Sequence, residues 1–147
     1  MKYRLPSVAA VTFAAVLSAL VMTVHPAQAQ ACANVEVQNV RPEQGMLMIA
    51  AYADAAGFSS KAPVTALQMR PGPAATMSFP LCGLSGASVA LTLFQDLNGN
   101  GKLDANVLGM PTEPWGASGK PVAMSAPTWE TTVVPLDGTT IVVKLSK

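Results

Sequence analysis

Short apolar segments separated by turn-forming residues follow one another along most of the chain. Some alternate apolar and polar residues, as at Val35 and Val37, and others are continuously apolar, as in residues 46–53. Segments of about four to eight residues with these patterns, bounded by Gly, Pro, Asn and Asp, are typical of β-strands. Beyond the first 29 residues no window sustains the period of an amphipathic helix. The expected strands comprise residues 34–40, 46–53, 64–70, 74–79, 88–95, 131–136 and 139–145.

The order of these segments predicts an all-β fold. About seven short strands with regular turns favour an antiparallel β-sandwich of the immunoglobulin-like or prealbumin-like kind. The apolar segments 46–53 and 88–95 are expected at the centre of a sheet. The strands on either side of Pro71-Gly72-Pro73 are expected at edges, because proline cannot donate a ladder hydrogen bond. The last two strands flank Asp137-Gly138, which predicts a hairpin with a type I′ turn.

Two longer connections interrupt the strands. Residues 54–61 are expected to form a loop. Residues 105–121 contain several prolines and glycines and predict a long, ordered surface connection. Three apolar residues are expected to pin that connection to the domain: Val107, Leu108 and Trp115.

The start of the chain has the pattern of a secretory signal peptide. Lys2 and Arg4 form a basic segment, residues 5–24 are almost uninterruptedly apolar, and Pro26 precedes the small-x-small site Ala27-Gln28-Ala29. We therefore expect a signal peptide over residues 1–29 and a single domain over residues 30–147. Two alternatives are an uncleaved membrane anchor and a lipoprotein attached through Cys32, although the residues before Cys32 lack a lipobox.

Removing the signal peptide changes the chemistry that is available. It leaves 118 of the 147 residues, with seven basic and eight acidic side chains, and it removes the only histidine, His25. A chain of this length forms one compact domain. Its formal charge of −1 provides no electrostatic footprint for nucleic acid or anionic lipid.

Both cysteines remain after cleavage. An even number of cysteines in an exported chain predicts a disulfide, here between Cys32 and Cys82. A redox-active pair would more often be close in sequence, as in Cys-x-x-Cys, so we expect a structural bridge.

The most distinctive polar pattern lies at residues 96–104. Oxygen-bearing side chains occupy every second position at Asp96, Asn98 and Asn100, a glycine follows, and Asp104 stands at the ninth position. This matches most of the D-x-[DN]-x-[DN]-G pattern of calcium loops, and Ca²⁺ prefers oxygen ligands of this kind. The sequence therefore predicts a Ca²⁺ site.

The predicted site departs from an EF-hand. An EF-hand loop carries a bidentate glutamate at position twelve, where this chain has Val107. The carbonyl of Lys102 or the carboxylate of Glu113 is therefore expected to complete the ligand set. With two charged ligands, Asp96 and Asp104, we expect a weak affinity, with Kd of about 0.1 to 1 mM. The alternative is a series of Asx and Asn-Gly turns without an ion.

The pattern continues beyond residue 104 through further positions: Asn106, Gly109, Pro111, Glu113 and Gly116. Residues 94–116 together resemble the signature of a bacterial family, domain of unknown function 2141. The chain departs from that signature at Ala117 and Gly119. The resemblance implies a small exported β-sandwich and brings no established activity. The loop is also similar to calcium loops in prealbumin-type repeat domains of bacterial surface proteins.

Other residues suggest weaker alternatives. The methionines would suit a soft copper site, but no histidine remains to complete a usual copper shell, and methionine commonly fills core gaps. Serines such as Ser118 lack a histidine base, and Asp54 beside Tyr52 is not singled out by spacing. Trp115 and Trp129 suit either a binding patch or the core. The methionines are Met46, Met48, Met69, Met77, Met110 and Met124.

These observations predict a binding or structural-association module in the periplasm or outside the cell. We expect no catalytic residues, and a partner that is an unidentified envelope protein or polysaccharide. Nucleic acid and stable membrane insertion after signal cleavage are not expected. The alternative is a small periplasmic enzyme or a metal carrier.

Overall fold

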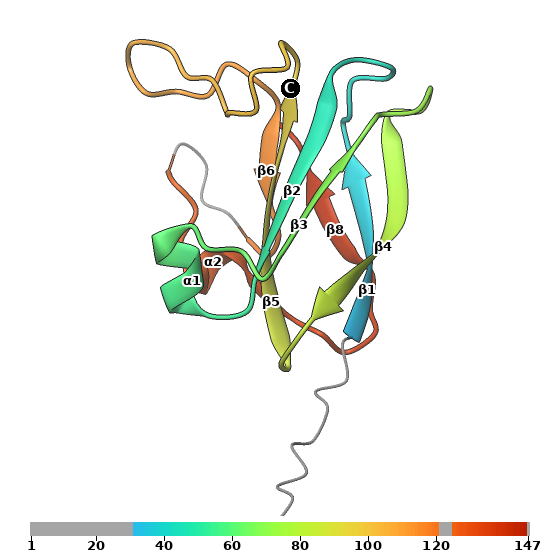
Figure 1. Cartoon of the computed structure of the whole chain (residues 1–147), viewed down its shortest axis with the longest axis vertical. Coiled ribbons are helices and arrows are strands. Elements are labelled where there is room, and N and C mark those ends of the chain that lie inside the picture. The colour runs from blue at the N-terminus through green and yellow to red at the C-terminus, as the bar shows by residue number, and fades with distance from the viewer. Residues whose placement is uncertain (1–30, 121–124, 147) are drawn as a thin grey trace, which may run out of the picture.

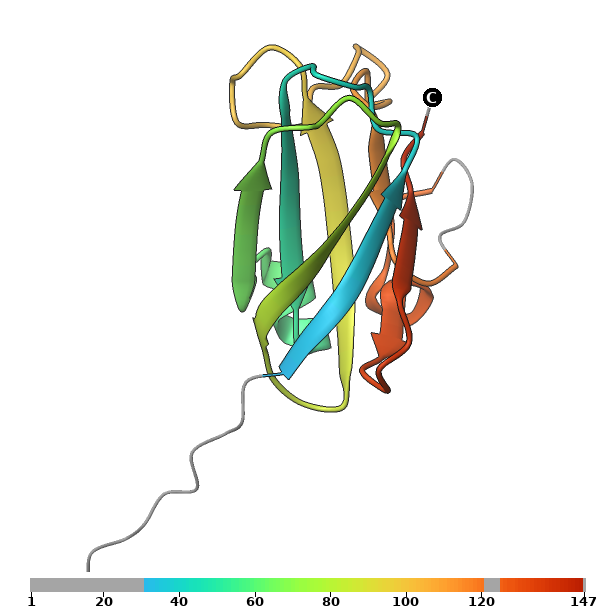
Figure 2. The same ribbon diagram turned by 90° about the vertical axis from the view of Figure 1, so that its right-hand side faces the viewer.

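Two β-sheets pack face to face in the computed structural model, which describes residues 31–120 and 125–146 (Figures 1 and 2). The smaller sheet has the strand order β4-β1-β8, and the larger has the order β3-β2-β5-β6 with β7 also paired to β5. This arrangement confirms the β-sandwich. The expected signal peptide lies outside the described residues. The elements are β1 (Ala31–Gln38), β2 (Met46–Tyr52), α1 (Ala55–Ser60), β3 (Thr65–Met69), β4 (Thr76–Leu84), β5 (Ser88–Asp96), β6 (Trp115–Ala117), α2 (Trp129–Thr132), β7 (Val133–Pro135) and β8 (Ile141–Lys144).

The core lies between the sheets and follows the two-residue period of the sequence. Val35 and Val37 of β1 are fully buried in the same cluster as Leu47 of β2 and Leu91 of β5. Alternate side chains of a strand point to opposite faces, so these residues turn inward while their neighbours face outward. β2 and β5 form a continuous antiparallel ladder from Met46 opposite Asp96 to Tyr52 opposite Ala90.

The expected centre and edges of the sheets are confirmed. β2 and β5 are interior strands, whereas β3 and β4 are edge strands. Pro80 lies within β4, where an edge position tolerates a residue without an amide hydrogen. β4 extends to Leu84, five residues beyond the expected end at residue 79.

The expected hairpin around Asp137-Gly138 is wrong. β7 pairs antiparallel with β5 in the larger sheet, whereas β8 pairs parallel with β1 in the smaller sheet, with Val35 opposite Ile141. The Asp137-Gly138 turn therefore carries the chain from one sheet to the other. Thr139 donates two hydrogen bonds to Asp137 Oδ1, from its amide at 3.0 Å and from its hydroxyl at 2.6 Å. A local turn of this kind serves a sheet crossing as well as a hairpin.

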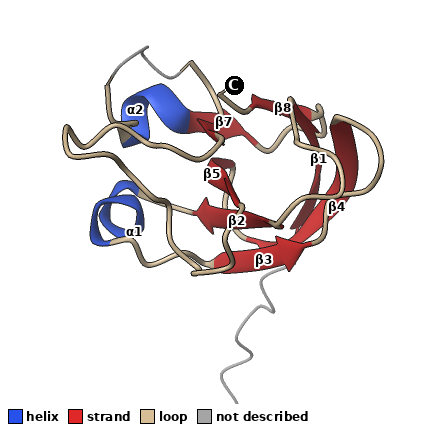
Figure 3. Ribbon diagram, turned by 90° about the horizontal axis from the view of Figure 1, so that it is seen from above, coloured by secondary structure: helices blue, strands red, loops and turns tan. Residues whose placement is uncertain are grey.

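Two short helices replace parts of the expected loops and strands. The expectation of a loop over residues 54–61 is wrong, because α1 begins there with Asp54 as its N-cap. α2 takes the first residues of the expected strand 131–136. Figure 3 shows both helices beside the larger sheet, remote from β1, β4 and β8. Aromatic rings pack the helices together and against β2: the ring centroid of Phe58 in α1 lies 5.1 Å from that of Tyr52 in β2 and 6.3 Å from that of Trp129 in α2. Among the described residues no helix is long and apolar enough to cross a membrane.

Candidate functional site

The connection between β5 and β6 carries the residues of the expected site. It leaves the sheet at Asp96, the last residue of β5, and returns at Trp115, the first residue of β6. In Figure 1 this connection is the gold and orange loop that extends beyond the strand ends at the upper left. Both ends are therefore fixed by the larger sheet while the middle is open to solvent.

Asp96 forms the base of this loop. Its side chain is only 2% exposed. Oδ1 accepts hydrogen bonds from the amides of Gly99 at 2.7 Å and Asn100 at 3.3 Å, and Oδ2 accepts one from Gly101 at 2.7 Å. Hydrogen bonds from amides to an ionised carboxylate are stronger than neutral ones. The backbone is thus wrapped around the Asp96 carboxylate.

The three outer side chains of the pattern converge on one another. Asn98 Nδ2 lies 2.6 Å from Asp104 Oδ2, and Asn100 Nδ2 lies 3.0 Å from both carboxylate oxygens of Asp104. The amide oxygens of the asparagines accept backbone hydrogen bonds, Asn98 from Asn100 at 3.0 Å and Asn100 from Lys102 at 2.8 Å. The loop therefore combines Asx turns with a polar cluster around Asp104. The Lys102 side chain is exposed.

Glu113 reaches back to this loop from the residues just before β6. It is 6% exposed, and its Oε1 accepts a hydrogen bond from the amide of Leu97 at 2.8 Å. Its Oε2 accepts one from the amide of Asp104 at 3.2 Å. The sequence associated Glu113 with the loop, and the structure places it there as a clamp between the two ends of the 96–104 segment.

The donor set suits a hard cation better than a soft one. The loop provides carboxylate, amide and carbonyl oxygens, which Ca²⁺ prefers. Among the described residues no group of three or more His, Cys, Asp or Glu side chains is arranged to hold a metal. A cation here would need the oxygens of Asn98 and Asn100 in addition to Asp96 and Asp104. Their amide groups would then turn, so that oxygen replaces the N–H groups that face Asp104.

The outer part of the connection forms a second, smaller turn. The expectation that Val107 and Leu108 pin this segment is wrong, since Val107 is 101% exposed and Leu108 is 83% exposed. Asn106 holds the turn instead: its Oδ1 accepts hydrogen bonds from the amides of Leu108 and Met110, both at 3.0 Å. A short side chain with an oxygen acceptor can fix a turn without any contact to the core.

A buried glutamine, which the sequence did not single out, fixes the sheet beside the loop. Gln95 is 0% exposed. Its Nε2 donates to the carbonyls of Arg41 and Gln44, both at 2.7 Å, and its Oε1 accepts from the amide of Arg41 at 2.8 Å. The signal was present, because Gln95 occupies an inward position of β5, where a polar side chain requires partners.

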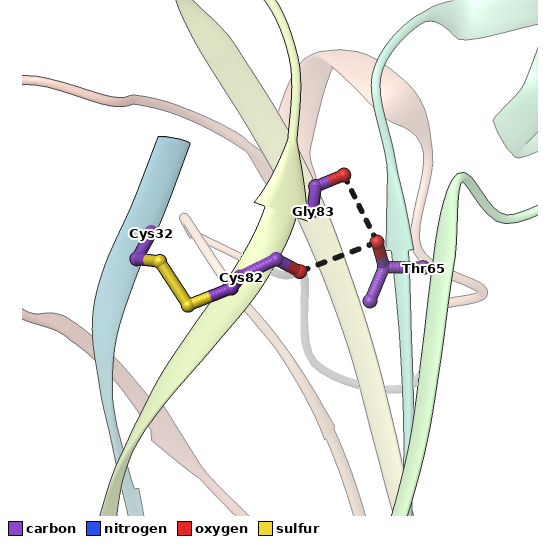
Figure 4. The surroundings of a disulfide bond; sticks show 4 residues. All are labelled: Cys32, Thr65, Cys82 and Gly83. Carbon is purple, nitrogen blue, oxygen red and sulfur yellow. Dashed lines mark hydrogen bonds between the residues drawn. A yellow bond between two sulfur atoms is a disulfide. The ribbon is translucent and has the colours of Figure 1, made fainter. Parts of the chain in front are cut away.

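The predicted disulfide is confirmed, and it lies near the N-terminal end of β1. Cys32 and Cys82 are joined with an S–S distance of 2.03 Å and link β1 to β4 (Figure 4). Beside the bridge, Thr65 Oγ1 donates to the carbonyls of Gly83 at 3.1 Å and Cys82 at 3.4 Å. These contacts join an edge strand of each sheet, so the bridge region closes one side of the sandwich.

Two residues considered for catalysis have structural partners. Ser118 is 0% exposed, donates to the Thr132 carbonyl at 2.6 Å and accepts from the Leu91 amide at 2.9 Å. Asp54 Oδ1 accepts from the Gly57 amide at 2.7 Å as the N-cap of α1. The Ser118 hydroxyl thus holds α2 against β5, and the Asp54 carboxylate begins a helix.

Most of the described domain, including the 96–104 loop, matches a known protein family. Residues 35–144 match the model of a family described as an uncharacterized protein conserved in bacteria, DUF2141. The chain belongs to this family. No curated protein and no solved structure matches it.

Proposed function

We propose that this protein is an exported bacterial module that acts by association at the cell envelope and whose 96–104 loop binds Ca²⁺. The observation that carries the calcium proposal is the convergence of Asn98, Asn100 and Asp104. The side-chain amides of Asn98 and Asn100 donate hydrogen bonds of 2.6 to 3.0 Å to the Asp104 carboxylate, so that three oxygen-bearing side chains lie close enough to share one cation once the amides turn their oxygens inward. Asp96 would add a second charged ligand from the base of the loop.

Export is supported by the disulfide and by the start of the sequence. Disulfides persist in oxidising compartments such as the bacterial periplasm, and the bridge joins residues 50 positions apart. The first 29 residues have the basic, apolar and small-residue segments of a signal peptide. Intact mass of protein recovered from the envelope tests export: cleavage after Ala29 is expected, and retention of the full sequence would contradict it.

A bound Ca²⁺ would fix the loop by replacing the hydrogen bonds from the side-chain amides of Asn98 and Asn100 to the Asp104 carboxylate with contacts between the ion and side-chain oxygens. The role of Asp96 and Glu113 is to hold the backbone in place before the ion arrives, since both carboxylates already accept hydrogen bonds from loop amides. Asn98, Asn100 and Asp104 would then supply side-chain oxygens, in addition to Asp96 at the base of the loop. The result is an association surface whose shape depends on extracellular calcium.

Calorimetric titration of the purified domain tests the calcium proposal. We expect one Ca²⁺ per chain with Kd of about 0.1 to 1 mM. Asp104→Ala should abolish the binding heat. The matched control is Asp137→Asn, which alters an exposed acid outside the loop and should leave binding unchanged. Equal titration curves for the wild type and Asp104→Ala would contradict the site.

A further inference from the structure

Exposed apolar side chains gather on the connection that carries the 96–104 loop. Six large apolar residues are exposed among the described residues, and four of them lie in the segment 103–110. Monomeric proteins scatter single apolar residues over their surfaces, whereas a concentration of this kind marks an interaction site. The four residues are Leu103 at 38%, Met110 at 42%, Leu108 at 83% and Val107 at 101% exposed.

The two most exposed side chains sit on a preformed turn. Gly109 N donates to Asn106 O at 2.9 Å, which closes a β-turn with Val107 and Leu108 at its centre. Gly109 has a φ of 77°, a conformation that a side chain would disfavour. The apolar pair is therefore held outward by the backbone and does not need to be ordered when it binds.

Three of the amides of this turn and the carbonyls of Asn106 and Met110 are already satisfied by internal hydrogen bonds. The amides of Leu108 and Met110 donate to Asn106 Oδ1, that of Gly109 donates to Asn106 O, and Met110 O accepts from Asn106 N at 2.8 Å. A polar backbone group that loses water without a partner is costly in an apolar environment. The amides of Leu108, Gly109 and Met110 keep these partners when the turn touches an apolar layer, which lowers the cost of a shallow contact with lipid.

We propose that the Val107-Leu108 turn inserts reversibly into the surface of a lipid bilayer. A stable protein complex needs about 800 Å² on each partner, far more than two side chains at a convex tip provide. A bilayer accepts a small apolar protrusion without a matching pocket. Lys102 is exposed beside Leu103, and its ammonium group can reach lipid phosphates while its stem lies in the apolar layer.

The charge of the loop links this contact to calcium, and in this respect the inference rests on the proposed function. Asp96, Asp104 and Glu113 against Lys102 give the loop a formal charge of −2. One Ca²⁺ would bring it to zero. Bringing uncompensated carboxylates towards a low-dielectric surface is unfavourable, so the calcium-bound loop should bind the bilayer more tightly.

Co-sedimentation with vesicles tests the proposal. The probes are vesicles of phosphatidylethanolamine and phosphatidylglycerol and vesicles of phosphatidylcholine alone, each with calcium or with chelator. In calcium, we expect the protein to bind vesicles of both lipid compositions, and in chelator we expect weaker binding. Raising the NaCl concentration from about 0.1 to about 0.5 M should change binding little, because salt does not screen the burial of apolar side chains. Binding to the acidic vesicles alone, lost at high salt, would overturn insertion in favour of a charge contact.

Variants at the tip separate this contact from folding. Leu108→Asp and Val107→Asp should each weaken binding about tenfold or more, since burying one such side chain corresponds to roughly that factor. Leu108→Trp should strengthen it. Val64→Asp, at a site 48% exposed outside the loop, is the matched control and should bind as the wild type does. Equal effects of Val64→Asp and Leu108→Asp would overturn the assignment of the tip.

Calcium-dependent melting of the same samples keeps the two proposals apart. A wild type that shows the calcium shift but never binds vesicles would overturn the bilayer contact and leave the calcium site standing. Vesicle binding that is lost in Leu108→Asp, without any calcium shift in melting, would support the tip and overturn the calcium site. Reversible dimerisation abolished by Leu108→Asp, without vesicle binding, would assign the turn to a second copy and overturn the bilayer contact.

Discussion

Glu113 Oε2 accepts a hydrogen bond from the backbone amide of Asp104 at 3.2 Å, although nine residues separate them. The other oxygen of the same carboxylate accepts from the amide of Leu97 at 2.8 Å. One buried side chain thus ties together the two ends of the segment that carries the polar pattern. The loop is closed before any ion or partner is considered.

Replacing Glu113 should loosen the loop and destabilise the domain. Glu113→Ala removes the side chain that accepts hydrogen bonds from the amides of Leu97 and Asp104. Each buried polar group that loses its partner lowers the free energy of unfolding by about 1 to 3 kcal/mol. We expect the free energy of unfolding to fall by about 2 kcal/mol, with a smaller loss in Glu113→Gln, which keeps one acceptor oxygen. Urea denaturation measures both. Glu43→Gln, at an exposed position, is the control and should be close to neutral.

Gly45 should not tolerate a side chain. Its φ is 56°, and a Cβ atom there would lie 2.0 Å from the carbonyl oxygen of Asp96. Gly45→Ala should therefore cost at least about 2 kcal/mol of stability. Gly86→Ala has a similarly positive φ of 89° but meets nothing within 4 Å, so it isolates conformational strain from the clash. If the two variants melt alike, the close approach to Asp96 is not what requires glycine.

The disulfide should stabilise the domain strongly. It spans a sequence separation of 50 residues, and a cross-link of this length contributes about 4 kcal/mol in the chain-entropy model. Reduction should lower the melting temperature by about ten degrees or more, because each kcal/mol corresponds to about 4 °C in a domain between the small and medium size classes. A double variant with Cys32→Ser and Cys82→Ser should have the melting temperature of the reduced wild type, and reductant should not change it. Unchanged melting of the wild type after verified reduction would refute this role.

Asp137 should make stability depend on pH. Hydrogen bonds from the Thr139 hydroxyl and then from the Thr139 amide lower the pKa of Asp137 below its ordinary value in the folded protein. The charged form is therefore favoured by folding. Its contribution is present above the ordinary pKa of aspartate and is lost as pH falls through the lowered pKa of the folded state.

Comparison of the wild type with Asp137→Asn isolates this contribution, because every other acid titrates in both proteins. The wild type should be more stable in urea at pH 7, and the difference should shrink as pH falls below about 4, near the ordinary pKa of aspartate. A difference that stays constant over this range would mean that Asp137 titrates alike in the folded and unfolded states.

Much of the fold follows from the pattern of apolar residues. The interior strands β2 and β5 and the edge strands β3 and β4 lie where their composition and prolines predicted. The disulfide followed from the even number of cysteines. These features depend on which residues face the core or lack an amide hydrogen, and both properties are visible in the sequence.

Other features depend on contacts that local sequence does not report. α1 has six residues, less than two turns, so it leaves no periodic signal and relies on the Asp54 cap and on Phe58 packing. The sheet crossing at Asp137-Gly138 has the residues of a hairpin turn. β8 joins β1 because Ile141 and Val143 complete the core of the smaller sheet.

The candidate site was predicted in part. The side chains of Asn98, Asn100 and Asp104, which the spacing grouped, meet in space, and Asp96 holds the loop through backbone amides; the Ca²⁺ site itself stays a prediction. The exposed turn at Val107 was missed, since apolar residues in a sequence indicate burial by default. Only the internal hydrogen bonds of Asn106 explain why that turn is stable in water.

Thermal melting with and without calcium tests the central claim most directly. After chelator treatment, calcium at ten times Kd should stabilise the fold by about 1.4 kcal/mol and raise the melting temperature by several degrees. Mg²⁺ should do less, because it demands a tighter octahedron and keeps its waters. Asp96→Ala and Asp104→Ala should lose the shift, while Asp137→Asn keeps it. If calcium at about 5 to 10 mM, beyond the range expected for weak extracellular sites, leaves the wild-type melting curve unmoved, the loop is a series of Asx turns and the calcium proposal is wrong.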